Sequence, residues 1–136
     1  MNDSCSVLII DDNPDDVFIA KRAIAKSRPD CDIQEAYDGL AAMEYLSNGR
    51  PPALILLDLK MPGIGGIEIL NLIRAREETR YIPVVILSSS KMEQDVKTSF
   101  KSGANSFLHK THDMTEFTEM LRMTLHYWMD LNLSPA

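Results

Sequence analysis

The sequence predicts an α/β protein with a central sheet of five parallel strands, and three observations support this fold class. Short β-branched apolar runs alternate five times with segments of helical periodicity, which is typical of successive βα units. Three of these runs are almost continuously apolar, as expected of central parallel strands that helices cover on both faces. The 136 residues, 45% of them hydrophobic, suffice for one buried core. We therefore expect one domain over residues 1–136, with a short apolar extension over about 128–136 and no output domain.

The expected strands cover residues 6–10, 32–36, 54–58, 84–87 and 106–109. The second is the most polar, and this composition suits an edge of the sheet. All apolar runs are far shorter than the roughly 20 residues that cross a bilayer, so we expect no membrane span. The first four residues lack the positive charge and the long apolar stretch of a secretory signal, and we expect a cytoplasmic location.

The first three helices have recognisable start signals. Asn13 offers an N-cap side chain before Pro14, which suits the first helical position, and the helix should run to about residue 27. Asp38 can cap a second helix that ends near residue 48. Gly66 begins a third helix, in which apolar residues repeat at helical spacing.

The last two helices are predicted in the same way. Ser90 and Glu93 have the spacing of a capping box, which would open a fourth helix. Gly103 would end that helix as a left-handed C-cap. Asp113 opens a fifth helix, which we expect to continue toward residue 131.

Polar side chains collect at the carboxyl ends of the strands. They are Asp11 and Asp12 after the first strand, Asp58 at the third, Ser88 at the fourth and Lys110 at the fifth. Ligands of open parallel sheets bind in the crevice beyond these ends. Converging carboxylates raise one another's pKa unless a cation intervenes, and Mg2+ is commonly held by carboxylates, waters and a phosphate. The pattern therefore predicts a Mg2+ site with phosphate chemistry.

Three of these residues also have an ordinary structural interpretation. Asp12 could cap the helix that begins near residue 14, and Ser88 could simply end a strand. Lys110 could be a solvated surface lysine. Their joint placement at one edge of the sheet favours the site.

Four segments at these strand ends resemble the response regulator receiver domain of two-component signalling. They are Ile9-Ile10-Asp11-Asp12-Asn13, Leu57-Asp58-Leu59-Lys60-Met61-Pro62-Gly63, Val85-Ile86-Leu87-Ser88 and Gly103-Ala104-Asn105-Ser106-Phe107-Leu108-His109-Lys110. The resemblance covers nearly the whole chain. It implies a flavodoxin-like (βα)5 fold with strand order 2-1-3-4-5, and phosphorylation of an aspartate.

The resemblance also implies a role for each polar residue. Asp58 matches the phosphoacceptor, and Lys110 matches the lysine that pairs with the phosphoryl group. The implied Mg2+ ligands are Asp12, Asp58 and the backbone carbonyl of Lys60, with Asp11 acting through water. Ser88 and Phe107 match the switch hydroxyl and the aromatic switch position. These roles agree with the chemistry, because Mg2+ and a lysine must neutralise the charge when a carboxylate attacks a phosphoryl group.

One residue departs from the family pattern. The family usually has proline after the lysine, often with a cis bond, but this chain has Thr111. A cis bond before a non-proline residue costs about 3 to 4 kcal/mol, so the sequence leaves open whether the Lys110-Thr111 bond is cis.

Other functions fit the sequence less well. A Mg2+-dependent phosphatase with an aspartyl nucleophile needs a second acid two residues after Asp58, where this chain has Lys60. A flavin module needs a glycine- and hydroxyl-rich phosphate loop after the first strand, where this chain has four aspartates. Nucleic acid is not an expected partner, because 14 Lys and Arg face 20 Asp and Glu with no basic cluster. Cys5 and Cys31 are expected to be buried or idle thiols.

The last helix carries more apolar surface than a core-facing helix needs. Phe117, Leu121, Leu125 and Trp128 form one stripe, which Met120, Met123 and Tyr127 widen to an arc of roughly 200°. We expect a homodimer through the fourth and fifth units, with Met123, Tyr127 and Trp128 near the contact.

The tail over residues 126–135 resembles those of single-domain regulators that pair with bacterial and cyanobacterial phytochromes. This resemblance implies a sensor histidine kinase of the phytochrome type as the phosphodonor. A chemotaxis-type regulator or a phosphorelay shuttle is the alternative, because it would share the same site.

Overall fold

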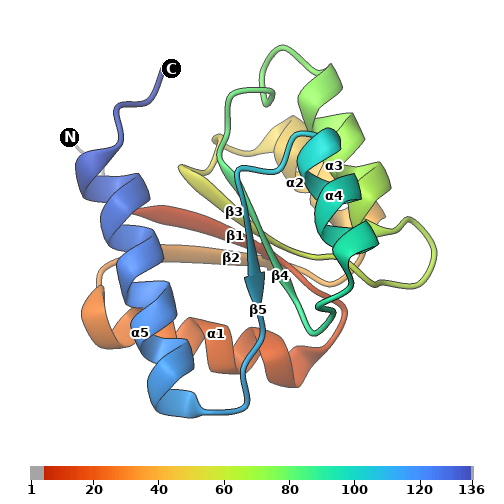
Figure 1. The fold of residues 1–136 in the computed structure, drawn as a ribbon. Helices are drawn as coiled ribbons and strands as arrows, with labels where there is room; N and C mark the ends of the chain where they lie inside the picture. The colour runs from red at the N-terminus through yellow and green to blue at the C-terminus, as the bar shows by residue number, and fades with distance from the viewer. Residues whose placement is uncertain (1–4, 136) are drawn as a thin grey trace.

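The computed structural model describes residues 5–135 and contains one parallel sheet with the strand order β2-β1-β3-β4-β5. Helices cover both faces of this sheet, so the predicted fold class and strand order are confirmed (Figure 1). The expectation for residues 1–4, and for the last residue of the C-terminal extension, lies outside the described residues. No helix within 5–135 is both long and apolar enough to span a membrane.

The elements alternate along the chain as predicted. In order they are β1 (Ser6–Ile10), α1 (Pro14–Ser27), β2 (Asp32–Ala36), α2 (Gly39–Asn48), β3 (Leu54–Asp58), α3 (Gly66–Ala75), β4 (Val84–Ser88), α4 (Glu93–Lys101), β5 (Ser106–His109), α5 (Met114–Leu125) and η1 (His126–Leu131). Four strands have the predicted bounds. The fourth is one residue longer, because Ser88 itself belongs to the strand.

The core has two halves, one on each face of the sheet. Alternate strand residues point to opposite faces, so Leu8 and Ile10 pack with α2 and α3, while Val7 and Ile9 pack with α1 and α5. In Figure 1, α1 and α5 lie together on one side of the sheet, and α2, α3 and α4 lie on the other. Every residue of β3 and β4 is buried, whereas the polar β2 is mostly exposed at the edge, as its composition predicts.

Four helix starts were predicted correctly: α3 begins at Gly66, as expected, and the other three have the predicted capping side chains. The Asn13 side chain accepts hydrogen bonds from the backbone N–H groups at the start of α1, one of them at 2.9 Å. Asp38 accepts from Ala41 N–H at 2.7 Å, and Asp113 accepts from Glu116 N–H at 3.0 Å. Because Asn13 is the cap of α1, Asp12 is not needed in that role.

The predicted start of α4 is wrong. Met92, not Ser90, is the N-cap residue, and its side chain makes no capping bond. The Ser90 hydroxyl accepts from Met92 N–H at 3.1 Å and donates to the Asp95 carboxylate at 2.6 Å, so it closes a turn ahead of the helix. At the other end, Gly103 has φ +106° after the C-cap Ser102, as predicted for a left-handed helix end.

The last helix changes type near its end. The α-helical hydrogen bonding stops at Leu125, and His126–Leu131 continues as a π-helix, η1. Met123 and Tyr127 are about half exposed, while Trp128 packs against the core on the α1 side of the sheet. The predicted surplus of apolar surface on this helix is therefore present.

The expectation for the cysteines is wrong, because Cys5 and Cys31 form a disulfide. The register of the sheet explains the pairing. Ser6 of β1 lies opposite Asp32 of β2, so the residues just before them are also opposite, with Cα atoms 4.8 Å apart. Cα atoms at this separation are within the usual range for a disulfide.

Candidate functional site

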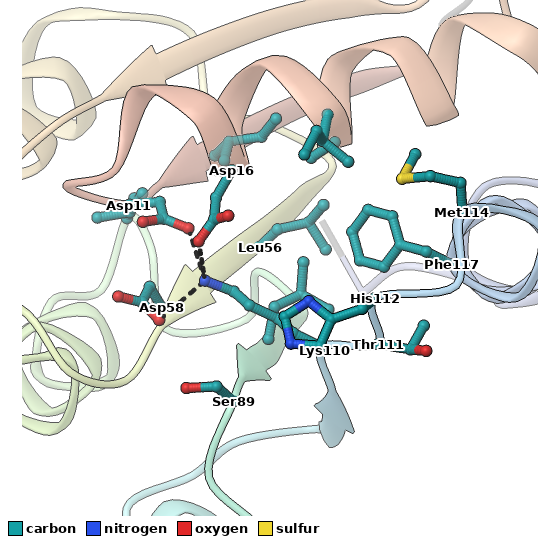
Figure 2. Close-up of a pocket in the computed structure, with 15 residues that line it drawn as sticks. Asp11, Asp16, Leu56, Asp58, Ser89, Lys110, Thr111, His112, Met114 and Phe117 are labelled. Carbon is teal, nitrogen blue, oxygen red and sulfur yellow. Dashed lines mark hydrogen bonds and ion pairs between the residues drawn. The ribbon is translucent and has the colours of Figure 1, made fainter.

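The predicted polar residues meet at the carboxyl ends of the three central strands and β5. Ile10 of β1 lies opposite Leu57 of β3, so the next residues, Asp11 and Asp58, emerge side by side. Asp58 in turn lies opposite Leu87 of β4. The order of the strands thus places the residues that follow them around one crevice (Figure 2).

Three carboxylates form a cluster in this crevice. Asp11, Asp12 and Asp58 each offer an oxygen, and these oxygens lie within 4.8 Å of one another. Asp11 and Asp58 are buried, whereas Asp12 is exposed. Asp11 Oδ1 accepts a hydrogen bond from Asn13 N–H at 3.0 Å, which fixes its orientation. A set of hard oxygen donors open to solvent on one side fits a divalent cation such as Mg2+.

Lys110 brings the positive charge of the site. Its ammonium lies 2.9 Å from Asp16 Oδ2, 3.0 Å from Asp11 Oδ2 and 3.3 Å from Asp58 Oδ1, and Figure 2 shows it surrounded by these carboxylates. The backbone N–H of Lys110 donates to the Ser88 carbonyl at 2.8 Å. Strand pairing therefore anchors the base of the side chain whose tip reaches the cluster.

The environment changes the pKa of both charged partners. Burial raises the pKa of Asp58 to about 6, with help from the charges of Asp11 and Asp12 and against the charge of Lys110. Burial lowers the pKa of Lys110, but hydrogen bonds to Asp16 and Asp11 and the charge of Asp58 outweigh it, so this pKa is above its usual value. Lys110 is consequently a permanent cation, while Asp58 is a carboxylate that the fold makes costly to ionise.

Ser88 and Phe107 lie on the same face of the sheet. Ser88 is fully buried at the end of β4, and its hydroxyl oxygen accepts from Ser90 N–H at 3.0 Å. Phe107 of β5 lies opposite Ile86, two residues before Ser88, and packs against the core on the α3 side while half-buried. The two residues therefore lie on adjacent strands and on the same face of the sheet.

Two predicted details can now be placed. The Lys110-Thr111 bond is trans, as are the other peptide bonds across residues 5–135. Thr111 instead holds its loop through its hydroxyl, which donates to Glu116 at 3.2 Å and accepts from Asp113 N–H. Lys60 lies in the loop after β3, and its ammonium is 3.5 Å from Asp95 Oδ2, facing α4.

Sequence reasoning missed two parts of the site. Asp16 was noted only among the acidic residues of its loop, yet it makes the shortest contact with Lys110. A cavity of about 210 Å³ also opens beside the cluster, with an apolar wall that includes Leu56, Met114 and Phe117. The position of Asp16 in the first turn of a helix that starts at the strand end was the available signal.

Residues 7–122 match the response regulator receiver domain, and the chain belongs to this family. Its members signal as phosphoacceptors, which implies a histidine kinase as partner, and they bind Mg2+ at an acidic pocket. The fold, the carboxylate cluster and the lysine described above agree with this membership.

The similarity to several known proteins extends over almost the whole chain. Response regulator Rcp1 of Synechocystis is 31% identical over 136 residues, covering 96% of this chain and 92% of Rcp1. The probable methanogenesis regulatory protein FilR2 of Methanothrix harundinacea is 31% identical over 135 residues, covering 96% and 87%. The phosphorylated cyanobacterial phytochrome response regulator RcpA has a TM-score of 0.91 at 28% identity, covering 98% of this chain and 100% of that one. The Mn2+-bound form of Rcp1 has a TM-score of 0.87 at 30% identity, with coverage of 98% and 100%.

Proposed function

We propose that Asp58 is the residue that accepts the phosphoryl group, and that Lys110 is the cation that stabilises it. The buried Asp58, with Lys110 at 3.3 Å and two further carboxylates beside it, is the observation that supports this assignment. Asp58 lies at the end of the central strand β3, where the crevice is open to a donor. The other carboxylates are less suited, because Asp12 is exposed and Asp11 is held by Asn13 N–H.

The transfer step needs charge neutralisation more than proton transfer. An Asp58 oxygen forms a bond to phosphorus, the P–N bond of a phosphohistidine breaks, and the imidazole keeps the electron pair and takes a proton. Two anions approach each other in this step, so the ammonium of Lys110 acts by stabilising the charge on the phosphoryl oxygens. Asp58 has to be oriented and ionised, and it is ionised above its pKa of about 6.

We propose Mg2+ as the metal of the site. Asp12, Asp58 and the backbone carbonyl of Lys60 would hold it, with Asp11 acting through a bound water. When bound, the metal would supply further positive charge at the phosphoryl oxygens. The cluster of three carboxylate oxygens within 4.8 Å supports this proposal, as does the Mn2+ in the similar Rcp1 structure.

Labelling with a radioactive small phosphodonor, such as acetyl phosphate, tests these assignments. We expect the wild type to incorporate the label when Mg2+ is present and to stay unlabelled when EDTA is added before the phosphodonor. Asp58→Asn should not be labelled, while Asp15→Asn, an exposed change nearby with the same loss of charge, should be labelled like the wild type. Label that persists in Asp58→Asn would disprove the role of Asp58.

We infer that the kinase partner is a bacterial or cyanobacterial phytochrome. The similarity to Rcp1, and to the phytochrome response regulator RcpA over 98% of this chain, supports this partner. Phosphotransfer from a purified phytochrome kinase, compared in its two light-adapted states, is the test. If the chain exchanged its phosphoryl group only with a free histidine phosphotransfer domain, and not with the phytochrome kinase, the alternative of a phosphorelay shuttle would be favoured.

We further propose a homodimer through the fourth and fifth units. Met123 of α5 and Tyr127 of η1 are about half exposed, and Tyr127 stacks edge-on against Trp128 at 4.9 Å. Exposed apolar side chains gathered on one helix are typical of an interface between two copies of a chain.

A further inference from the structure

Lys110 is held by an acid that lies outside the carboxylate cluster. The three oxygens that contact its ammonium belong to Asp11, Asp16 and Asp58, and the contact with Asp16 is the shortest at 2.9 Å. The lysine ammonium has three N–H donors and no acceptor. Each donor therefore has one carboxylate partner, and a new acceptor can bind only in place of one of them.

Asp16 differs from the other two partners in its position. Asp11 follows β1 and Asp58 is the last residue of β3, whereas Asp16 lies in the first turn of α1. Its backbone N–H donates to the Asn13 side chain at 3.4 Å, and its carboxylate, about one third exposed, faces the crevice (Figure 2). The oxygens that come within 4.8 Å of one another are those of Asp11, Asp12 and Asp58, so Asp16 is not part of the candidate metal site.

We propose that Asp16 is a positioning residue that restrains Lys110 and slows phosphoryl transfer. This inference rests on the proposed role of Asp58 as phosphoacceptor. The phosphoryl oxygens need the charge of Lys110 most in the transition state, whereas Asp16 binds that charge most strongly before the donor arrives. A contact that is stronger in the ground state than in the transition state opposes the reaction.

The local charges agree with this role. Four acids, Asp11, Asp12, Asp16 and Asp58, gather at the crevice, and all of them except Asp12 contact the ammonium of Lys110. A metal ion held by Asp11, Asp12 and Asp58 would neutralise much of their negative charge. Asp16 would then be the remaining acid that competes with the phosphoryl group for Lys110. The strength of the Asp16–Lys110 ion pair would then limit how strongly Lys110 can interact with the phosphoryl oxygens.

Asp15 offers a matched control. It precedes Asp16 in the same helical turn, and its side chain is exposed and makes no hydrogen bond or ion pair within the described residues. Asp15→Asn and Asp16→Asn remove the same charge near the same helix N-terminus, where acids stabilise the helix dipole. Only the second change removes an ion pair with Lys110.

The experiment compares phosphorylation rates with acetyl phosphate and saturating Mg2+, measured by intact-protein mass spectrometry. We expect Asp16→Asn to be phosphorylated roughly three- to tenfold faster than Asp15→Asn, which should match the wild type. Asp16→Glu keeps the charge and should stay close to the wild type. A rate for Asp16→Asn equal to or below that of Asp15→Asn would overturn the proposal, as would equally fast Asp16→Glu.

Two further measurements separate this proposal from the proposed function. If the wild type were not phosphorylated, or if Asp58→Asn still were, the assignment of Asp58 would fail whatever Asp16 does. Mg2+ affinity, measured by calorimetry without a phosphodonor, should be the same in Asp16→Asn and Asp15→Asn. A clear loss of affinity in Asp16→Asn alone would make Asp16 a metal ligand and overturn its role as a restraint.

Discussion

The folded structure disfavours the ionised form of Asp58. Asp58 is buried beside Asp11, and the pKa of about 6 lies above the ordinary value of 3.8. The folded protein therefore binds the Asp58 proton more tightly than the unfolded chain does. Between about pH 4 and pH 6 the folded state becomes less stable as pH rises, and the full penalty is present above pH 6.

The first prediction follows from this penalty. In metal-free buffer at pH 7.5, Asp58→Asn should be about 2 to 3 kcal/mol more stable than the wild type, because it removes the buried charge. At pH 4 the two should differ little, because Asp58 is then protonated in the folded wild type. Urea unfolding at both pH values checks this. Equal stabilities at pH 7.5 would show that Lys110 compensates the charge in full.

The second prediction concerns Asp12. Asn13, not Asp12, caps α1, and the Asp12 side chain is exposed. Asp12→Ala should leave the melting temperature in metal-free buffer unchanged and weaken Mg2+ binding about tenfold or more, since it removes one proposed ligand. Calorimetric titration with Asp15→Ala as control tests this. A large loss of melting temperature would instead assign Asp12 a structural role.

At the scale of the elements, β4 and β5 carry Ser88 and Phe107, the two residues that we expect to couple the site to the fourth and fifth units. Ser88 ends β4 with its hydroxyl accepting only the Ser90 N–H among the described contacts, and Phe107 lies nearby on the same face. Once Asp58 carries a phosphoryl group, the hydroxyl can gain a charge-assisted hydrogen bond by moving toward it. The space it leaves would admit the Phe107 ring.

The third prediction tests this coupling. Ser88→Ala should still be phosphorylated at Asp58, but the Phe107 ring should keep its unphosphorylated environment. Fluorine NMR of protein labelled with fluorophenylalanine, with and without acetyl phosphate and Mg2+, measures the change at Phe107. The same spectral shift in the wild type and in Ser88→Ala would rule out the serine as the link.

The elements were largely predictable, because β1, β3 and β4 are apolar runs and the starts of α1, α2 and α5 have capping side chains. The start of α4 was not, because the turn there uses Ser90 to bind Asp95, a partner that a capping pattern does not reveal. The π-helix was not predictable either, since the apolar stripe is compatible with either bonding pattern.

The candidate site was predictable where it depends on strand order. Asp58 ends β3, and Asp11 and Lys110 directly follow β1 and β5, so the sheet topology alone brings them together. Asp16 depends on the orientation of a helix relative to β5, which local patterns do not give. The disulfide needed the register of β1 against β2, and this register becomes known only when the strands are paired.

For the whole molecule, the fourth prediction concerns assembly. The wild type should sediment as a dimer at micromolar concentration, and Met123→Glu combined with Tyr127→Glu should shift it to a monomer, because charges are costly to bury without partners. Glu119→Gln, a change of an exposed residue on the same helix that pairs with Arg122, is a control that should leave the dimer intact. A monomeric wild type would refute the dimer, and an intact dimer in the double variant would place the interface elsewhere.

The surplus of acids around Lys110 also has a consequence for the order of events in solution. Without a metal the crevice carries several negative charges against one positive charge, so it attracts divalent cations and repels phosphate esters and acyl phosphates alike. The encounter rate with a metal ion should therefore fall as ionic strength rises, whereas the encounter rate with an anionic donor should rise. The same carboxylates that destabilise the metal-free protein thus favour a fixed order of binding, in which the cation binds first and the phosphodonor second.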